Sequence, residues 1–85
     1  MGRFGDQRLL EIYLYGHTAD VPPEASVTIR GELVTLLAVS GWTGMELVGD
    51  VFSLNGRLAI MLTPDWAISF EWWEGDGAFE MALEP

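Results

Sequence analysis

The C-terminal half of the chain alternates between short apolar stretches and turn residues, and this pattern restricts the possible folds most strongly. Residues 45–54 and 57–62 flank the dipeptide Asn55-Gly56, which favours the type I′ turn that joins antiparallel strands. Apolar side chains then alternate with small or charged ones in residues 66–73 and 78–83. We therefore expect four strands connected in chain order as an antiparallel meander.

Residues 8–15 predict a further strand before this meander. In an extended chain Leu10, Ile12 and Leu14 would share one side, with Tyr13 and Tyr15 on the other. Branched and aromatic side chains in a period of two are typical of a strand. The expected sheet therefore has about five strands.

Residues 24–40 predict a helix. Their apolar side chains fall on one helical stripe, which begins beside Pro22-Pro23 and ends before Gly41. The segment also contains several β-branched residues and Gly31, which weaken a helix and leave a strand as the alternative.

These elements predict an α+β fold, in which a small antiparallel sheet packs against one helix near residues 24–40. The alternating pattern assigns ten side chains to the covered face of the sheet: Leu10, Ile12, Leu14, Trp66, Ile68, Phe70, Trp72, Phe79, Met81 and Leu83. The opposite face would carry Tyr13, Tyr15, Ala59, Met61, Ala67 and Trp73. This second face is too apolar to be fully solvated, so either another surface covers it or the sheet curls into a small all-β barrel.

Size and composition exclude several classes of protein. The chain has 85 residues, thirteen Asp and Glu, four Arg, no Cys and a formal net charge of −9. This length predicts a single domain, residues 1–85. The negative charge argues against direct binding to nucleic acid, because phosphate contacts need clustered cations. Without Cys there is neither a disulfide framework nor a thiolate zinc site. No stretch approaches the ~20 apolar residues that span a bilayer, and the N-terminus lacks a signal-peptide pattern, so we expect a cytoplasmic protein without membrane association.

The sequence offers little for catalysis. His17 and Asp20 could form a base and its orienting carboxylate, but no Ser or Cys nearby supplies a nucleophile, so a solvated loop histidine is favoured. The segment from Glu74 to Gly77 resembles a calcium loop in spacing only, because it lacks the alternating ligands and the bidentate glutamate. We therefore predict a non-enzymatic protein with no metal and no cofactor.

Charge and tryptophan content are the most informative features for function. All four cations precede residue 58, whereas residues 58–85 contain six acids and no base. Of the four tryptophans, at positions 42, 66, 72 and 73, the alternating pattern turns Trp73 away from the expected core. An acidic surface with an aromatic centre would steer onto a basic partner. The residues expected to bind this partner are Glu71, Trp73, Glu74, Asp76 and Glu80.

The leading hypothesis is therefore an acidic protein–protein interaction module, an inhibitor of a basic, nucleic-acid-binding protein or complex. The alternative is a structural subunit of a homo-oligomer or larger assembly, in which Tyr13, Tyr15, Met61 and Trp73 cover one another across a symmetry axis. A small-molecule binder lined by Trp and Met is a third possibility.

Overall fold

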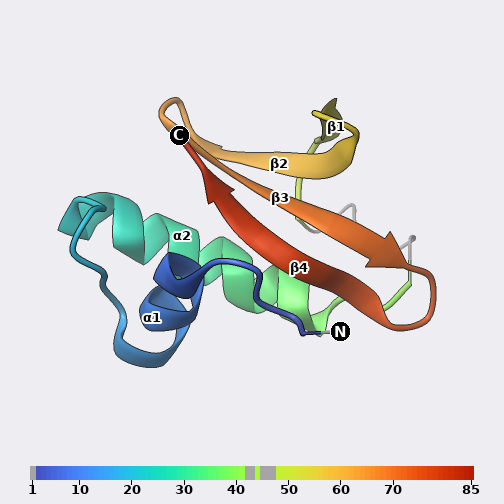
Figure 1. Ribbon diagram of the computed structural model, residues 1–85, viewed down its shortest axis with the longest axis horizontal. Coiled ribbons are helices and arrows are strands. Elements are labelled where there is room, and N and C mark those ends of the chain that lie inside the picture. Colours follow the sequence, from blue (N-terminus) through green and yellow to red (C-terminus); the bar gives the residue numbers. More distant parts are fainter. Residues whose placement is uncertain (1, 42–43, 45–47) are drawn as a thin grey trace.

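The computed structural model describes residues 2–41, 44 and 48–85. These residues form two helices and four strands: α1 (Gln7–Tyr15), α2 (Pro23–Ala38), β1 (Val51–Leu54), β2 (Arg57–Thr63), β3 (Trp66–Trp73) and β4 (Gly77–Glu84). The strands form an open antiparallel sheet in the order β1-β2-β3-β4, and both helices lie on one side of it (Figure 1). The predicted α+β fold and meander are confirmed. The sheet has four strands rather than about five, and the barrel alternative is not supported.

The expected strand over residues 8–15 is wrong, because this segment forms helix α1. The Asp6 carboxylate caps the start of the helix by accepting a hydrogen bond from the Arg8 N–H at 2.9 Å. Gly16 ends it in the left-handed conformation, with φ of 84°, and donates its N–H to the Ile12 carbonyl. Six of the nine residues between the two caps are apolar or aromatic, so the alternating pattern does not distinguish a strand from a helix that buries Leu9 and Ile12.

Helix α2 confirms the helix expected near residues 24–40. It begins at Pro23, where the absent N–H is not needed, and it buries Ile29, Leu33 and Leu36 on one side. Gly31 lies on the exposed side of the helix, where a side chain would meet open space, so its cost to the helix is limited to backbone entropy.

The hairpin predicted at Asn55-Gly56 is also confirmed. Both residues have positive φ, 52° and 80°, as a type I′ turn requires, and Leu54 pairs with Arg57 across it. Strand β1 begins at Val51, whereas the expectation began at residue 45; residues 45–47 lie outside the described part of the chain.

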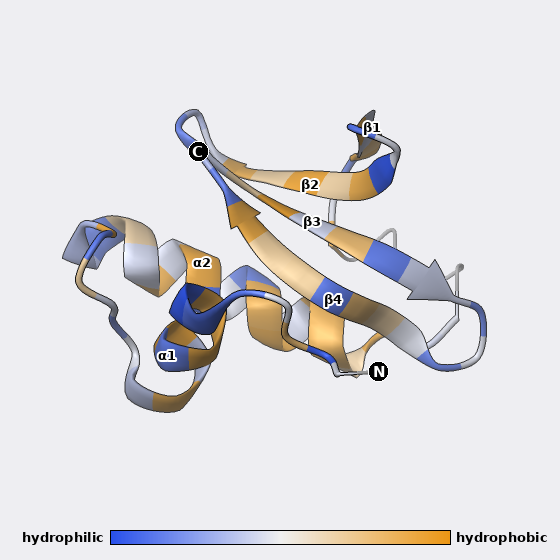
Figure 2. Ribbon diagram, viewed as in Figure 1, coloured by the Kyte–Doolittle hydropathy of each residue, from blue (hydrophilic) through white to orange (hydrophobic). Residues whose placement is uncertain are grey.

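The core lies between the helices and the sheet. Leu9 and Ile12 of α1 and the buried side of α2 pack against the sheet residues Ile60, Ile68, Phe70, Met81 and Leu83, all of which are 0 to 1% exposed. Figure 2 shows the matching hydrophobic colour along the strands and in stripes on α2. No helix among the described residues has the length and apolar character needed to cross a membrane.

Residues 2–5 cover one edge of the sheet. They run parallel to β4, with Phe4 opposite Met81. The Met81 N–H donates to the Arg3 carbonyl at 3.0 Å, and the Gly5 N–H donates to the Met81 carbonyl at 2.9 Å. The edge formed by β4 is therefore paired along its middle, whereas β1 forms the other edge.

Candidate functional site

The face of the sheet turned away from the helices, called the outer face below, is partly apolar. Its floor consists of Ala59, Ala67 and Ser69, which are buried although no described helix lies over them. Met61 and Trp73, on the same face, are 60% and 49% exposed. The floor is made of small buried residues, so Met61 and Trp73 contribute most of the exposed hydrophobic surface among these residues.

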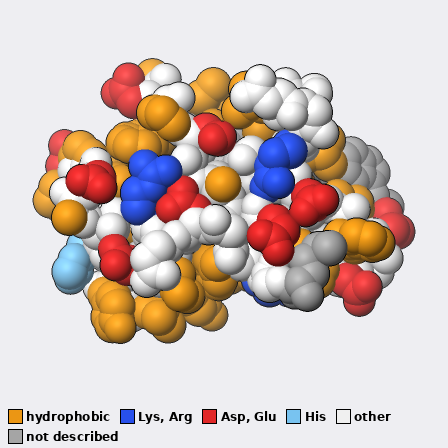
Figure 3. Space-filling model, in the orientation of Figure 1, with side chains coloured by type: hydrophobic (Ala, Val, Ile, Leu, Met, Phe, Trp, Pro, Cys, Tyr) orange, Lys and Arg blue, Asp and Glu red, His pale blue; other side chains and the backbone are white. Residues whose placement is uncertain are grey.

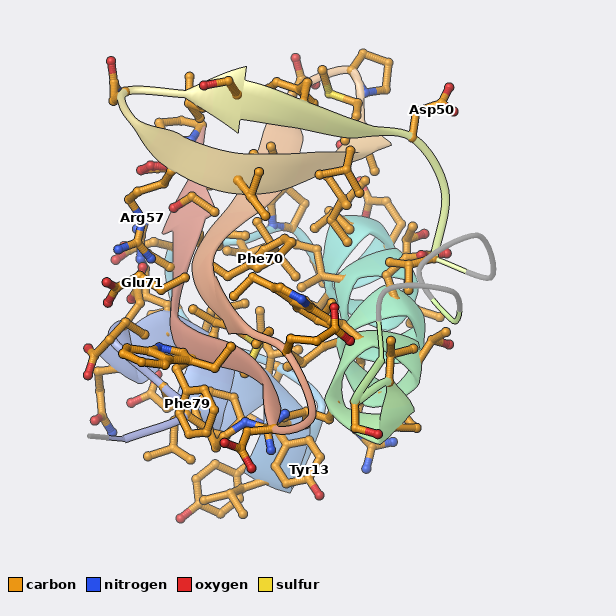
Figure 4. All side chains as sticks on the ribbon, turned by 90° about the vertical axis from the view of Figure 1, so that its right-hand side faces the viewer. Tyr13, Asp50, Arg57, Phe70, Glu71 and Phe79 are labelled. Carbon is orange, nitrogen blue, oxygen red and sulfur yellow. The ribbon has the colours of Figure 1, made fainter. Side chains whose placement is uncertain are left out.

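The end of the β3–β4 hairpin, residues 71–80 and here called the hairpin tip, carries the residues that the sequence nominated. Glu71 and Trp73 are two residues apart on β3 and share the outer face. Phe79 is paired directly with Glu71 across the strands. Figure 4 shows Arg57, Glu71 and Phe79 on the side of the sheet away from α2, whereas Phe70 points between the sheet and α2. The tip therefore places two aromatic side chains beside an exposed carboxylate.

The position of Phe79 corrects the expectation that it faces the core with Met81 and Leu83. Glu80 has a left-handed φ of 51°, and the register between β3 and β4 shifts at this point, from Ser69–Ala82 to Glu71–Phe79. This bulge adds one residue to β4 and reverses the orientation of the residues before it. Ala78, not Phe79, is therefore buried against the core. Nothing in the local sequence pattern signals the bulge.

The hairpin tip is held firmly against the end of α2. The Gly75 N–H donates to the Ser40 carbonyl at 2.9 Å, and the Asp76 N–H donates to the Trp73 carbonyl at 2.9 Å. At Gly77, where φ is 100°, an added Cβ would lie 2.6 Å from the Val39 carbonyl oxygen, so only glycine permits this approach. The Glu74 carboxylate lies beside Gly41. These contacts anchor the backbone of the tip to the residues that follow α2.

A surface groove of about 340 Å³ lies beside the tip and is lined by residues 56–58 and 70–73. It joins the start of β2 to the end of β3 and includes Arg57, Glu71 and Trp73. Arg57 reaches across β3 and donates a hydrogen bond to the Glu80 carbonyl in β4. The groove is therefore a shallow feature with an aromatic wall and one side chain of each charge.

All four arginines donate hydrogen bonds to backbone carbonyls of their own chain. Arg3 donates to Ala78 at 2.6 Å, Arg8 to Leu83 at 2.9 Å and Arg57 to Glu80, so these three converge on β4 from three different segments. Arg30 donates to the Tyr13 carbonyl at 3.3 Å. The guanidinium of Arg3 also lies 4.9 Å from the centre of the Phe79 ring. Three of the four arginines therefore tie other segments to β4, whereas Arg30 is exposed in the helix layer.

The Asp6–Arg8 pair is the one ion pair formed by an arginine within the described residues. The Arg8 Nη2 atom lies 2.8 Å from the Asp6 carboxylate, which also accepts from the Leu83 N–H at 3.1 Å. Partial burial acts to raise the pKa of Asp6, but the hydrogen bonds from Arg8 and Leu83 outweigh it, so the pKa lies below its ordinary value of 3.8. The hydrogen bond to Asp6 in turn raises the pKa of Arg8. This pair ties the start of α1 to the end of β4.

The carboxylates of the hairpin tip differ in how far they are exposed. Glu71, Glu74 and Asp76 are exposed, whereas Glu80 is half-buried and leans over Gly5. In the view of Figure 3, the blue arginine side chains lie in separate patches, with red carboxylates around them. No group of three His, Asp or Glu side chains within the described residues could hold a metal ion.

The structure does not gather all the nominated residues on one surface. Tyr13 and Tyr15 are 38% and 68% exposed at the end of α1, in the helix layer, whereas Met61 and Trp73 belong to the outer face. Trp66 and Trp72 are half-buried and pack against the core, and Trp42 lies outside the described residues. Sequence reasoning missed Phe79, which the bulge turns to the outer face and leaves half-buried, and Arg57, whose place beside Glu71 follows from the hairpin register.

In comparisons with known proteins, no family model and no curated protein sequence matches this chain.

Proposed function

We propose that this protein is a non-catalytic interaction module that binds a basic protein surface through its hairpin tip. It would inhibit a nucleic-acid-binding protein or complex by covering the positive surface that contacts nucleic acid. The arrangement of charge carries the proposal. The arginines bond to carbonyls of their own chain, whereas Glu71 and Asp76 are exposed around a half-exposed Trp73.

The chemistry of the tip fits such a partner in two ways. Trp73 and Phe79 supply rigid aromatic area, the kind of surface that forms the centre of protein interfaces. The carboxylates around them would attract Lys and Arg of the partner, raise the association rate and disfavour acidic competitors. Because the tip is anchored to Ser40 and Val39, little conformational entropy is lost when it binds.

A comparison of two variants with equal net charge tests the proposal. Glu71→Gln with Asp76→Asn neutralises the tip, whereas Asp20→Asn with Glu24→Gln removes two exposed carboxylates near the start of α2. Each protein is immobilised and exposed to a cell extract, and the retained proteins are identified and eluted with salt. We expect the wild type and the α2 variant to retain the same basic proteins and the tip variant to lose them.

Equal loss from both variants would show that only net charge matters and would contradict a specific site. Retention of mainly acidic or neutral proteins by the wild type would contradict the proposed partner class. Circular dichroism of each variant confirms that the fold is intact before the comparison is made.

A further inference from the structure

The two edge strands of the sheet, β4 and β1, differ in whether another segment pairs with them. Residues 2–5 pair with β4, but no segment within residues 2–41, 44 and 48–85 pairs with the outward side of β1. Soluble proteins usually protect such an edge with charge, proline or a bulge. Strand β1 has the sequence Val-Phe-Ser-Leu and pairs with β2 in regular register, so it carries no charge, proline or bulge, and within the described residues its short length is what limits further pairing.

The hairpin register determines which backbone groups of β1 point outward. Leu54 and Arg57 close the two-residue turn, so they form a hydrogen-bonded pair. Pairs alternate along an antiparallel ladder, so Phe52 also bonds to β2, whereas Val51 and Ser53 turn their N–H and C=O groups away from it. The outward edge therefore presents two donors and two acceptors.

We propose that β1 pairs antiparallel with β1 of a second copy of this chain, around a two-fold axis at Phe52. In this register Val51 of each copy faces Ser53 of the other, and all the outward N–H and C=O groups of both strands are satisfied. The two Phe52 side chains meet at the axis on the outer face, as an aromatic cross-strand pair. A register centred on Ser53 would instead pair Val51 with Asn55, a turn residue with φ of 52°.

The uncharged sequence of β1 and its self-complementary register favour a second copy as the occupant, despite the net charge of −9 on each copy. No residue of β1 is charged, so the pairing sets no like charges opposite each other within the strand. Phe52, Leu54 and Met61 border a cavity of about 160 Å³ that Asp65 and Glu84 also line, and the two-fold axis would place the cavities of the two copies on one continuous face. Four-residue strands bury little area, so the dimer is expected to be weak and to depend on concentration.

The dimer and the basic partner respond to salt in opposite directions. Each copy carries a formal charge of −9, so salt screens the repulsion between copies and strengthens the dimer. Salt weakens attraction between the acidic tip and a basic partner. Failure of one proposal is thus distinguishable from failure of the other, because the dimer is measured on the protein alone.

Size-exclusion chromatography with light scattering, over a range of concentrations and at low and high salt, tests the dimer. We expect the molar mass to rise from 9.4 kDa towards about twice that value with concentration, and more readily at high salt. Phe52→Lys and Phe52→Glu should each prevent the rise, because like charges then meet at the axis. Mixing the two variants should restore the dimer as a heterodimer.

Ser53→Pro and Ser53→Thr form a second, independent pair of variants. Ser53 is exposed and its N–H points outward, so proline removes a donor to the second copy and none to β2, whereas threonine keeps it. Only the proline variant should remain monomeric. A wild type that is monomeric at every concentration and salt overturns the proposal. So does a dimer that persists in both Phe52 variants, or two folded Phe52 variants that do not associate when mixed.

Discussion

Trp72 and Trp73 are neighbours in the chain, but the strand turns them to opposite sides of the sheet. Trp72 packs against the core and lies edge-on to Phe70, with ring centres 6.5 Å apart. Trp73 is half exposed on the outer face beside Glu71. A structural role and an interaction role can therefore be separated by substituting one residue at a time.

Trp72→Ala should lower the free energy of unfolding by about 2 kcal/mol, because it leaves a void beside Phe70. Trp73→Ala should lower it by less than about 1 kcal/mol, because half of this side chain is already in water. Urea unfolding measures both. A larger loss of stability in the Trp73 variant than in the Trp72 variant would show that Trp73 is a packing residue and would remove the aromatic centre of the proposed site.

Asp6 links the stability of the fold to pH. It caps α1, pairs with Arg8 and accepts from the Leu83 N–H, so Asp6→Ala should cost about 2 kcal/mol near pH 7. Its pKa is lower in the folded chain than its ordinary value of 3.8. The carboxylate therefore stabilises the fold above pH ~4, and this contribution disappears as the pH falls through the folded-state pKa.

Urea unfolding of the wild type and Asp6→Ala between neutral and strongly acidic pH measures this effect. The difference between the two proteins should narrow on acidification. Asp6→Asn keeps an acceptor for the helix cap and should lie between them at neutral pH. A difference that stays constant down to pH ~2 would contradict the ionised role of Asp6.

At the scale of elements, the bulge at Glu80 determines what the hairpin tip displays. Glu80 takes a left-handed backbone conformation, which costs most side chains about 1 kcal/mol or more, and the Arg57 side chain donates to its carbonyl. The bulge turns Phe79 towards the outer face beside Glu71. The backbone conformation of Glu80 therefore determines whether Phe79 belongs to the proposed interface.

Two substitutions that remove the same charge test the bulge. Glu80→Asn should stay within about 0.5 kcal/mol of the wild type, because asparagine tolerates the left-handed region. Glu80→Val should lose about 1–2 kcal/mol, because a β-branched residue there is strained. Thermal unfolding compares the two variants. Equal stabilities would show that the bulge does not depend on the conformation of residue 80.

The elements also show where sequence reasoning succeeds. Helix α2 and the Asn55-Gly56 hairpin were predictable, because their start, stop and turn residues are local signals. The same kind of signal was present for α1, in Asp6 and Gly16, but alternation in a segment rich in leucine and tyrosine favoured a strand. The orientation of Phe79 was not predictable, because it depends on a register shift between two strands and not on the residues around it.

At the scale of the whole molecule, the arginines and the carboxylates have different places in the fold. Three arginines, from the N-terminal segment, α1 and β2, donate to the carbonyls of β4 and hold the layers together. The exposed carboxylates make the electrostatic potential around the protein negative. Two of them, Glu71 and Asp76, lie at the aromatic hairpin tip, which is anchored to Ser40. The sequence predicted the acidic character of this region, whereas the hydrogen bonds from three arginines to β4 could be found only in the structure.

Calorimetric titration with a synthetic peptide that carries arginines on both sides of an aromatic centre tests this account most directly. The titration compares the wild type, the Glu71→Gln, Asp76→Asn variant and the Asp20→Asn, Glu24→Gln control. We expect the wild type and the control to bind alike, the tip variant to bind about tenfold more weakly, and wild-type affinity to fall as salt rises from about 0.05 to 0.5 M. Equal binding by the tip variant and the control, or binding indifferent to salt, would contradict this account.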